Sequence, residues 1–206
     1  MLLYLVRHGQ SESQLAGDDI PDGSLTPLGL AQAEAAADYL AGQSIDLLIS
    51  SPFRRALQTA DALRRRTGTP VEVWRNLSEL RGVQYPLHRF MSRTAVGEVC
   101  PGASCEDDYP DDGFDHGLES REAIHERSLA VQGRLRSRFG GTELKVAVFA
   151  HWVFNSIFLT DLIGRPFGPG FAFELANASV CRVRITEDQV RLLSANEICH
   201  LPEVTY

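Results

Sequence analysis

The chain has 206 residues, of which 44% are hydrophobic and 23% are charged, and its net charge at pH 7 is −7. This length and apolar content suffice for one domain with a sizeable core. The acidic balance argues against a broad surface for nucleic acid or anionic membranes, so we expect a small molecule as the partner.

The amino-terminal residues lack the pattern of a signal peptide, and no apolar stretch is long enough to span a membrane. We therefore expect a cytoplasmic protein that binds neither a membrane nor a nucleic acid. Four cysteines lack the paired spacing of common zinc sites and are expected to be reduced thiols: Cys100, Cys105, Cys181 and Cys199. A bridge between Cys100 and Cys105 is the less favoured alternative.

Apolar runs alternate with helical patterns along most of the chain. Strands are predicted at residues 2–6, 46–49, 71–74 and 145–149, followed by a hairpin over 179–185 and 189–195. Helices are predicted at residues 27–41, 54–66, 120–139 and 155–163, the first with Thr26 as N-cap and Gly42 at its end. This order predicts an α/β fold, a three-layer sandwich whose mainly parallel sheet is flanked by helices, with the strand ends at one ligand-binding edge.

Residues 83–117 interrupt this alternation with prolines, aromatic residues and five aspartates. The stretch has little periodicity, so we predict an inserted, lid-like region within a single domain of residues 1–206. Its acidic residues match part of a calcium-loop template, but Pro110 occupies a ligand position, and no metal site is predicted.

The first predicted strand stops abruptly at Arg7, His8 and Gly9. An imidazole is nucleophilic only when it is neutral, and a neighbouring guanidinium disfavours its protonated form and offers a fork for phosphate oxygens. Gly9 allows the backbone to come close to an anion. A single histidine after a strand is more often structural, so the weight of this motif depends on its partners.

Two further strand ends supply such partners. The second strand runs into Arg54 and Arg55 in the first turn of a helix, where backbone N–H groups and the helix dipole favour phosphate. The strand at 145–149 is followed by His151. Because parallel strands end at a common edge, these groups and His8 are expected to form a pocket for a phosphoryl group.

With these motifs, the chain resembles the histidine phosphatase superfamily, whose fold is shared by cofactor-dependent phosphoglycerate mutases and many small phosphatases. The matching segments are 5–9, 25–29 with Gln32 and Ala33, 50–60, and 150–151. The resemblance covers most of the chain outside the lid-like region and implies a phosphoglycerate mutase-like fold. It also implies that His8 becomes phosphorylated, that Arg7 and Arg55 clamp the phosphate, and that His151 is the second histidine of the phosphate pocket.

The resemblance places Glu79 at the position of the family's proton donor. A carboxylic acid there would protonate the leaving oxygen and later deprotonate the attacking water. The spacing from Glu79 to Gly82 is one residue shorter than this motif leads us to expect. Glu106, Asp107 or Asp108 in the lid-like region is therefore an alternative donor.

Three residues or segments depart from the family pattern. Trp152 follows the second histidine where the family usually has glycine, and its ring should narrow or reshape access to the pocket. Gln14 stands where an asparagine often lies near the phosphate. Residues 117–120 resemble the family's Gly-Glu-Ser turn with one extra leucine. Substrate selectivity is expected around Trp152 and in the lid-like region.

The leading hypothesis is a phosphomonoesterase that hydrolyses a small soluble phosphate ester in two steps through a phosphohistidine. It would be a metal-independent, histidine acid phosphatase-type hydrolase without a cofactor. Phosphoglycerate mutase-type transfer is the alternative, but Arg89 and Arg93 are the only evident cations of the acidic lid-like region. A phospholigand-binding protein without turnover is a third hypothesis. A homodimer is compatible with the sequence.

Overall fold

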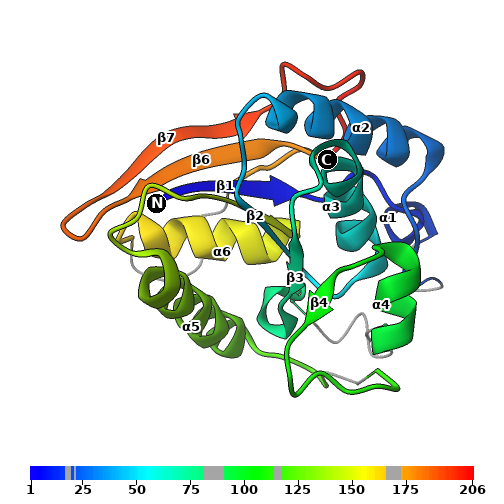
Figure 1. The fold of residues 1–206 in the computed structure, drawn as a ribbon, viewed down its shortest axis with the longest axis horizontal. Helices are drawn as coiled ribbons and strands as arrows, with labels where there is room; N and C mark the ends of the chain where they lie inside the picture. The colour runs from blue at the N-terminus through cyan, green and yellow to red at the C-terminus, as the bar shows by residue number, and fades with distance from the viewer. Residues whose placement is uncertain (17–19, 21, 81–90, 114–116, 166–172) are drawn as a thin grey trace.

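A seven-stranded sheet forms the centre of the computed structural model, which describes residues 1–16, 20, 22–80, 91–113, 117–165 and 173–206 (Figure 1). The strand order is β4-β3-β2-β5-β1-β6-β7. The parallel strands are β1 (Leu2–Arg7), β2 (Leu47–Ser50), β3 (Val71–Val73), β4 (Ser104–Cys105) and β5 (Lys145–Ala150). An antiparallel hairpin of β6 (Val180–Ile185) and β7 (Val190–Glu197) extends the sheet beside β1. The predicted α/β fold with a mainly parallel sheet is confirmed.

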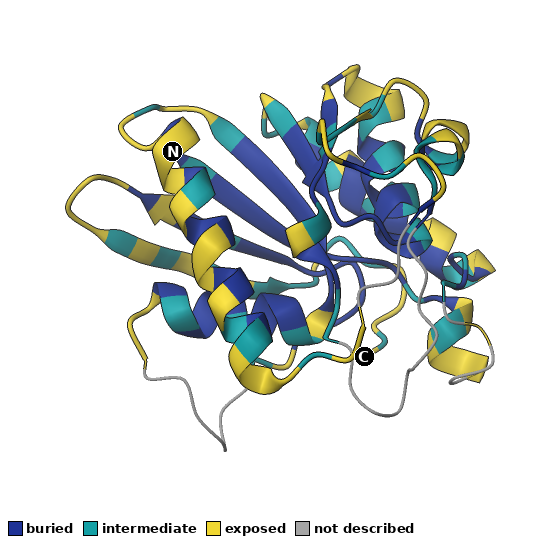
Figure 2. Cartoon of the chain, turned by 90° about the horizontal axis from the view of Figure 1, so that it is seen from below, coloured by how far each residue is buried: buried dark blue, intermediate teal, exposed yellow. Residues whose placement is uncertain are grey.

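Helices cover both faces of the sheet, and the central strands are buried along most of their length (Figure 2). Leu3 and Leu5 of β1 pack in one core cluster with α5 (Arg121–Phe139) and α6 (Trp152–Leu162). Tyr4 and Val6 point to the opposite face and pack with α2 (Pro27–Ala41) and α3 (Arg54–Thr67). Successive side chains of a strand face opposite sides, so the apolar run of β1 serves two cores.

The boundaries of α2 follow the sequence signals. The Thr26 hydroxyl accepts the N–H of Gly29 at 3.0 Å, Pro27 occupies the first turn, and Gly42 is the C-cap. A side chain that accepts a first-turn N–H satisfies a backbone donor that the helix itself leaves unpaired. The helix therefore begins and ends where its capping residues predict.

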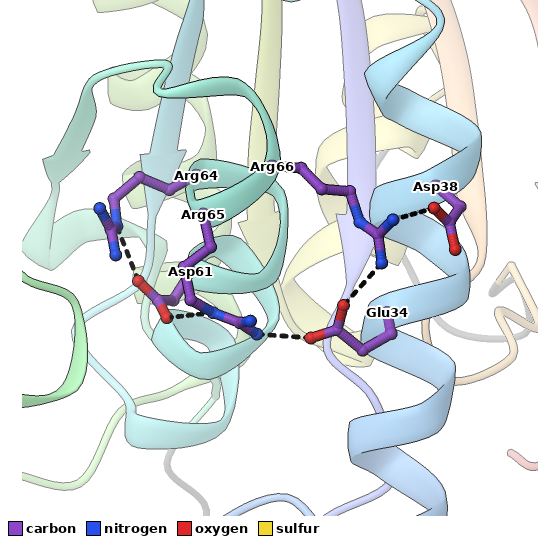
Figure 3. A network of polar contacts seen from close by, with 6 residues as sticks. All are labelled: Glu34, Asp38, Asp61, Arg64, Arg65 and Arg66. Atoms are coloured by element: carbon purple, nitrogen blue, oxygen red, sulfur yellow. Dashed lines mark hydrogen bonds and ion pairs between the residues drawn. The ribbon is translucent and has the colours of Figure 1, made fainter.

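The exposed sides of α2 and α3 are joined by a network of ion pairs (Figure 3). Arg65 and Arg66 of α3 both pair with Glu34 of α2, and Arg66 also pairs with Asp38. Asp61 pairs within α3 with Arg64 and Arg65. Because most of these side chains are well exposed, the network adds little stability and depends on salt.

Residues 93–105 of the predicted lid-like region have regular secondary structure, although the sequence there has little periodicity. This part contains α4 (Arg93–Val99), which Ser92 caps by accepting the N–H of Ala95, and the edge strand β4, which pairs with β3. Both elements are short, and α4 includes Gly97, so neither gives a periodic signal. The expectations for Gly82 and Arg89 fall outside the described residues.

Two further short elements were not predicted, and one helix boundary differs from the prediction. The helix α1 (Glu12–Ala16) and the 3-10 helix η2 (Arg75–Leu77) are additional. The helix α6 begins at Trp152, three residues before the predicted start.

All four cysteines are unbridged, including Cys100 and Cys105. Within the described ranges, no helix is long and apolar enough to cross a membrane.

Candidate active site

Three parallel strands end side by side at the carboxyl edge of the sheet. Arg7 at the end of β1 is in register with Ala150 at the end of β5, and Ser50 of β2 is in register with Phe149. The next residues stay joined by backbone hydrogen bonds: the His8 N–H donates to the Ala150 carbonyl at 3.0 Å. The register therefore places His8 and His151 beside each other, as the positions of the strand ends predict.

His8 is 4% exposed, and both of its ring nitrogens have defined surroundings. Nδ1 lies 2.7 Å from the Gly9 carbonyl oxygen, while Nε of Arg55 donates to Nε2 at 3.2 Å. A carbonyl and a guanidinium offer one acceptor and one donor, so Nδ1 carries the proton and Nε2 carries the lone pair. Burial, with Arg55 and Arg7 adding to it, holds the pKa of His8 well below its ordinary value. His8 is thus a neutral imidazole whose Nε2 is unprotonated.

His151 is fully buried, and its ring lies 5.1 Å from that of His8 at an interplanar angle of 61°. Its Nε2 is 2.7 Å from the Ser51 hydroxyl oxygen, which also accepts the N–H of Phe53 at 3.3 Å. The hydroxyl has one proton and two lone pairs; when it donates that proton to Nε2, the ring proton lies on Nδ1. Within the described parts of the chain Nδ1 has no hydrogen-bond partner. In this tautomer His151 presents a buried N–H that suits a phosphate oxygen.

Two buried guanidinium groups accompany the histidines. Arg7 is 5% exposed and donates through Nη1 to the Leu175 carbonyl, while its Nε has no hydrogen-bond partner among the described residues. Burial lowers the pKa of Arg7 to about 10, with Glu79 opposing and Arg55 reinforcing the shift, so Arg7 stays charged at neutral pH. Arg55 lies over the Phe53 ring at 4.6 Å. Two buried cations beside His8 favour a doubly charged phosphate.

The first turn of α3 is not fully open to a ligand. A carboxylate oxygen of Asp22 accepts the Arg54 N–H at 2.8 Å, so this end of the helix is capped by a residue 32 positions earlier. Burial raises the pKa of Asp22 to about 6, although Arg55 and the hydrogen bond from Arg54 oppose the shift. Of the two arginines in this turn, Arg55 reaches His8, as the resemblance to the family implied. Asp22 was not among the predicted site residues.

Gly9 has a packing reason to be glycine. A Cβ at this position would lie 2.4 Å from the Gly29 carbonyl oxygen, which is closer than real Cβ contacts allow. The Gly9 N–H donates to the Thr59 hydroxyl at 3.2 Å. Contact between Gly9 and phosphate stays a prediction, whereas its close approach to α2 is set by the fold.

Glu79 lies at the amino-terminal end of α6, next to His151. Its Oε1 accepts the N–H groups of Leu80 and Phe154 at 2.9 and 3.0 Å, and its Oε2 accepts that of Val153 at 3.1 Å. The negative charge of Glu79 also acts to raise the pKa of Arg7, against the effect of burial. This capping carboxylate explains the early start of α6, since it satisfies backbone donors that the sequence after His151 leaves without a cap.

The alternative proton donors are engaged elsewhere. Glu106 accepts the Arg75 N–H at 2.9 Å and pairs with Arg134, and Asp108 pairs with Arg75. The Asp107 carbonyl accepts from Arg93 at 3.4 Å, and within the described residues no hydrogen bond or ion pair joins its side chain to the histidines. Among the candidate acids, Glu79 is the one that binds the first turn of α6, which begins directly after His151.

Gln14 and Trp152 lie near the histidines, and no hydrogen bond among the described residues joins either side chain to a histidine ring. Gln14 forms a reciprocal amide pair with Asn177, whose Nδ2 also donates to the His8 carbonyl at 3.2 Å. Asn177 was missed, because nothing near it in the sequence marks it. Trp152 is 43% exposed and donates through its indole N–H to the Phe173 carbonyl at 2.8 Å. Its effect on access to the pocket stays a prediction.

A buried neutral histidine between two buried guanidinium groups is suited to accept a phosphoryl group, and known proteins point to the same chemistry. Residues 3–198 match the model of the histidine phosphatase superfamily (branch 1). The chain belongs to this family.

Individual relatives narrow the activity to hydrolysis. A glucosyl-3-phosphoglycerate phosphatase of Mycolicibacterium vanbaalenii is 34% identical over 175 residues, which are 80% of this chain and 75% of that protein. A mycobacterial glucosyl-3-phosphoglycerate phosphatase solved with VO3 matches at a TM-score of 0.68 and 26% identity, covering 95% of this chain and 98% of its own. The alpha-ribazole phosphatase of Shigella flexneri shares the fold at a TM-score of 0.72 and 22% identity, with 96% of each chain covered. The predicted family, fold and activity, hydrolysis of a small phosphate ester, are confirmed.

Proposed function

We propose that the protein hydrolyses its phosphate ester through a covalent phosphohistidine on His8, without a metal ion or cofactor. The observation that carries this proposal is the arrangement of the His8 ring: Nδ1 is bound to the Gly9 carbonyl, and the unprotonated Nε2 faces Arg55 at 3.2 Å. A nucleophile that is neutral, fixed in orientation and next to a cation is prepared to attack a bound phosphate.

In the first step, the phosphate lies between Arg7, Arg55 and the Nδ1–H of His151. His8 Nε2 attacks phosphorus, the N–P bond forms, and the bond from phosphorus to the ester oxygen breaks. Protonated Glu79 gives its proton to that oxygen, so the alcohol leaves neutral. The two guanidinium groups stabilise the charge on the transferred phosphoryl group, which is the main requirement of this reaction.

In the second step, water replaces the alcohol. The Glu79 carboxylate takes a proton from the water, the oxygen of the water bonds to phosphorus, and the N–P bond breaks. Inorganic phosphate leaves, His8 is neutral again, and Glu79 is protonated for the next cycle. Because two arginines provide the positive charge, this scheme uses no metal.

The substrate proposal follows from the relatives and from the lid-like region. A phosphorylated sugar acid of the glucosyl-3-phosphoglycerate type is the first candidate, on the strength of 34% identity to a phosphatase of that name. Phosphoryl transfer to a second site would need a cation that holds a second anion, and Arg93 is a candidate for this role. The Arg93 guanidinium is bound by Asp111 and by the carbonyls of Glu106 and Tyr109. This engagement favours hydrolysis over transfer.

The test compares wild type and His8→Ala on a panel of phosphorylated sugars, glycerates, nucleotides and phosphopeptides, with phosphate release as the readout. We expect wild type to release phosphate from one class of small ester and His8→Ala to release none. His125→Gln serves as the matched control, because His125 pairs with Asp161 away from the pocket. Interconversion of phosphoglycerate isomers would favour a mutase, and phosphate binding without hydrolysis would favour a binding protein.

We also propose that the protein works in the cytoplasm, which the four unbridged cysteines support. Binding of nucleic acid is not expected from its acidic charge, and a homodimer stays a prediction. Light scattering of the purified protein measures the oligomeric state directly.

A further inference from the structure

A buried ion pair lies behind the segment that carries Glu79. Arg127 of α5 binds both carboxylate oxygens of Glu119, through Nε at 2.8 Å and Nη2 at 2.6 Å, and each side chain is 7% exposed. Removing two charges from water is costly, and a two-pronged geometry with further hydrogen bonds is what offsets that cost. A buried ion pair with this geometry is well suited to hold a neighbouring backbone segment in one conformation.

The remaining edge of Arg127 fixes the chain just before Glu79. Its Nη1 donates to the carbonyl of Asn76 at 2.8 Å and to the carbonyl of Ser78 at 2.7 Å. These carbonyls belong to η2 and to the residue that follows it, between the end of β3 and Glu79. The backbone that aims the Glu79 side chain is thus held from α5.

Arg127 also reaches the residues that hold the Glu79 carboxylate. Its guanidinium carbon lies 5.4 Å from the centre of the Phe154 ring, and the Phe154 N–H donates to Glu79 Oε1 at 3.0 Å. One side chain therefore contacts both the segment that carries Glu79 and the first turn of the helix that Glu79 caps. Its donors are bound to Glu119, Asn76 and Ser78, so Arg127 does not act as a third phosphate clamp.

We propose that the Arg127–Glu119 pair is a positioning element for Glu79, which keeps its carboxyl group within reach of the leaving oxygen and thereby sets the efficiency of proton transfer. This inference rests on the proton-donor role given to Glu79 in the proposed function. It assigns to Arg127 and Glu119 an effect on the step that releases the alcohol and none on binding of the phosphate.

The leaving group separates this role from a merely structural one. An alkyl alcohol is a poor leaving group that needs a proton, whereas p-nitrophenolate leaves without one. Loss of positioned proton donation costs about 10²–10⁴-fold in rate, and a displacement of about 1 Å costs up to about 100-fold. We expect Arg127→Lys, which keeps the charge and loses the fork, to lower kcat on an alkyl phosphate by roughly 10–100-fold. Phosphohistidine formation from p-nitrophenyl phosphate and the affinity for inorganic phosphate should be nearly unchanged.

The experiment measures single-turnover phosphoryl transfer from an alkyl phosphate and from p-nitrophenyl phosphate. Its variants are Arg127→Lys, Glu119→Gln and Glu79→Gln, with Arg136→Lys as the control. Arg136 is an exposed residue of the same helix, and its substitution should change neither rate. Circular dichroism and thermal unfolding check that each variant is folded, and Glu119→Gln decides the question where Arg127→Lys does not fold.

The possible outcomes separate the inference from the function on which it rests. A rate loss on the alkyl phosphate alone in Arg127→Lys, Glu119→Gln and Glu79→Gln supports the positioning role. The double variant Arg127→Lys, Glu79→Gln should then lose no more rate than Glu79→Gln alone. An equal loss on both substrates, or no loss on either, in Arg127→Lys and Glu119→Gln overturns the inference while Glu79→Gln remains selective. If Glu79→Gln itself shows no selectivity, the proton-donor role in the proposed function is wrong, and the positioning role is wrong with it.

Discussion

Replacing Ser51 by alanine tests how the orientation of His151 is maintained. The Ser51 hydroxyl is buried and lies 2.7 Å from His151 Nε2. In the proposed mechanism it donates to Nε2 and so keeps the ring proton on Nδ1. In Ser51→Ala, Nε2 remains buried without this donor, at a cost of about 1–3 kcal/mol. If the cost falls on the transition state, kcat/KM decreases by roughly 5–150-fold.

The assay is kcat/KM on p-nitrophenyl phosphate, combined with the inhibition constant of vanadate as a measure of phosphate-pocket geometry. Both should worsen together, because the Nδ1–H of His151 is proposed to bind a phosphate oxygen. Ser179→Ala is the matched control, since the Ser179 hydroxyl is buried without a hydrogen-bond partner in the described chain. Unchanged kcat/KM in Ser51→Ala would refute the assignment of the His151 proton to Nδ1.

Three further predictions follow from burial and packing. Burial and nearby arginines hold the pKa values of His8 and His151 well below their ordinary 6.5, so kcat/KM, corrected for substrate ionisation, should persist as the pH falls through 6.5. The unfolded state takes up protons there that the folded histidines reject, so the free energy of unfolding should decrease below about pH 6.5; an acid limb above that pH contradicts the first expectation, and constant stability the second. Gly9→Ala places a Cβ 2.4 Å from the Gly29 carbonyl, and overpacking of about 1–3 kcal/mol should lower Tm by about 2–4 °C per kcal/mol, whereas an unchanged Tm would show that the loop moves freely. Glu34→Gln removes the ion pairs of Glu34 with Arg65 and Arg66 and leaves the pair between Arg66 and Asp38, so Tm should fall slightly at low salt but not in about 1 M salt; a large loss of Tm that persists in salt would contradict a weak, screened surface interaction.

The strands and the central residues of the site were predictable because their signals are local. The buried runs of β1 and β5 read as strands, and in a parallel sheet the residues just beyond such runs share one edge. The proximity of Arg7, His8 and His151 at this edge was therefore predictable without knowledge of any contact. The capped helix α2 was predictable for the same reason, since Thr26 and Gly42 lie directly at its ends.

The supporting contacts were not predictable because their partners are far apart along the chain. Asp22 caps α3, and Glu79 caps α6 across 75 residues, so neither helix start has its capping residue in the neighbouring sequence. Asn177 reaches the His8 carbonyl across 169 residues. In the sequence, Arg127 looks like an ordinary polar residue on a long helix. It is buried because α5 packs against η2, where its guanidinium binds the carbonyls of Asn76 and Ser78.

The central claim is that the phosphoryl group passes through His8, and the most direct measurement is the site of covalent phosphate on the enzyme. Wild type and Glu79→Gln are mixed with labelled p-nitrophenyl phosphate, quenched in alkali, where phosphohistidine survives, and mapped by peptide mass spectrometry. We expect label on the peptide that contains His8, with more label in Glu79→Gln because attack by water lacks its base, and none in His8→Ala. Label on another residue, or hydrolysis by His8→Ala at the wild-type rate, would contradict it.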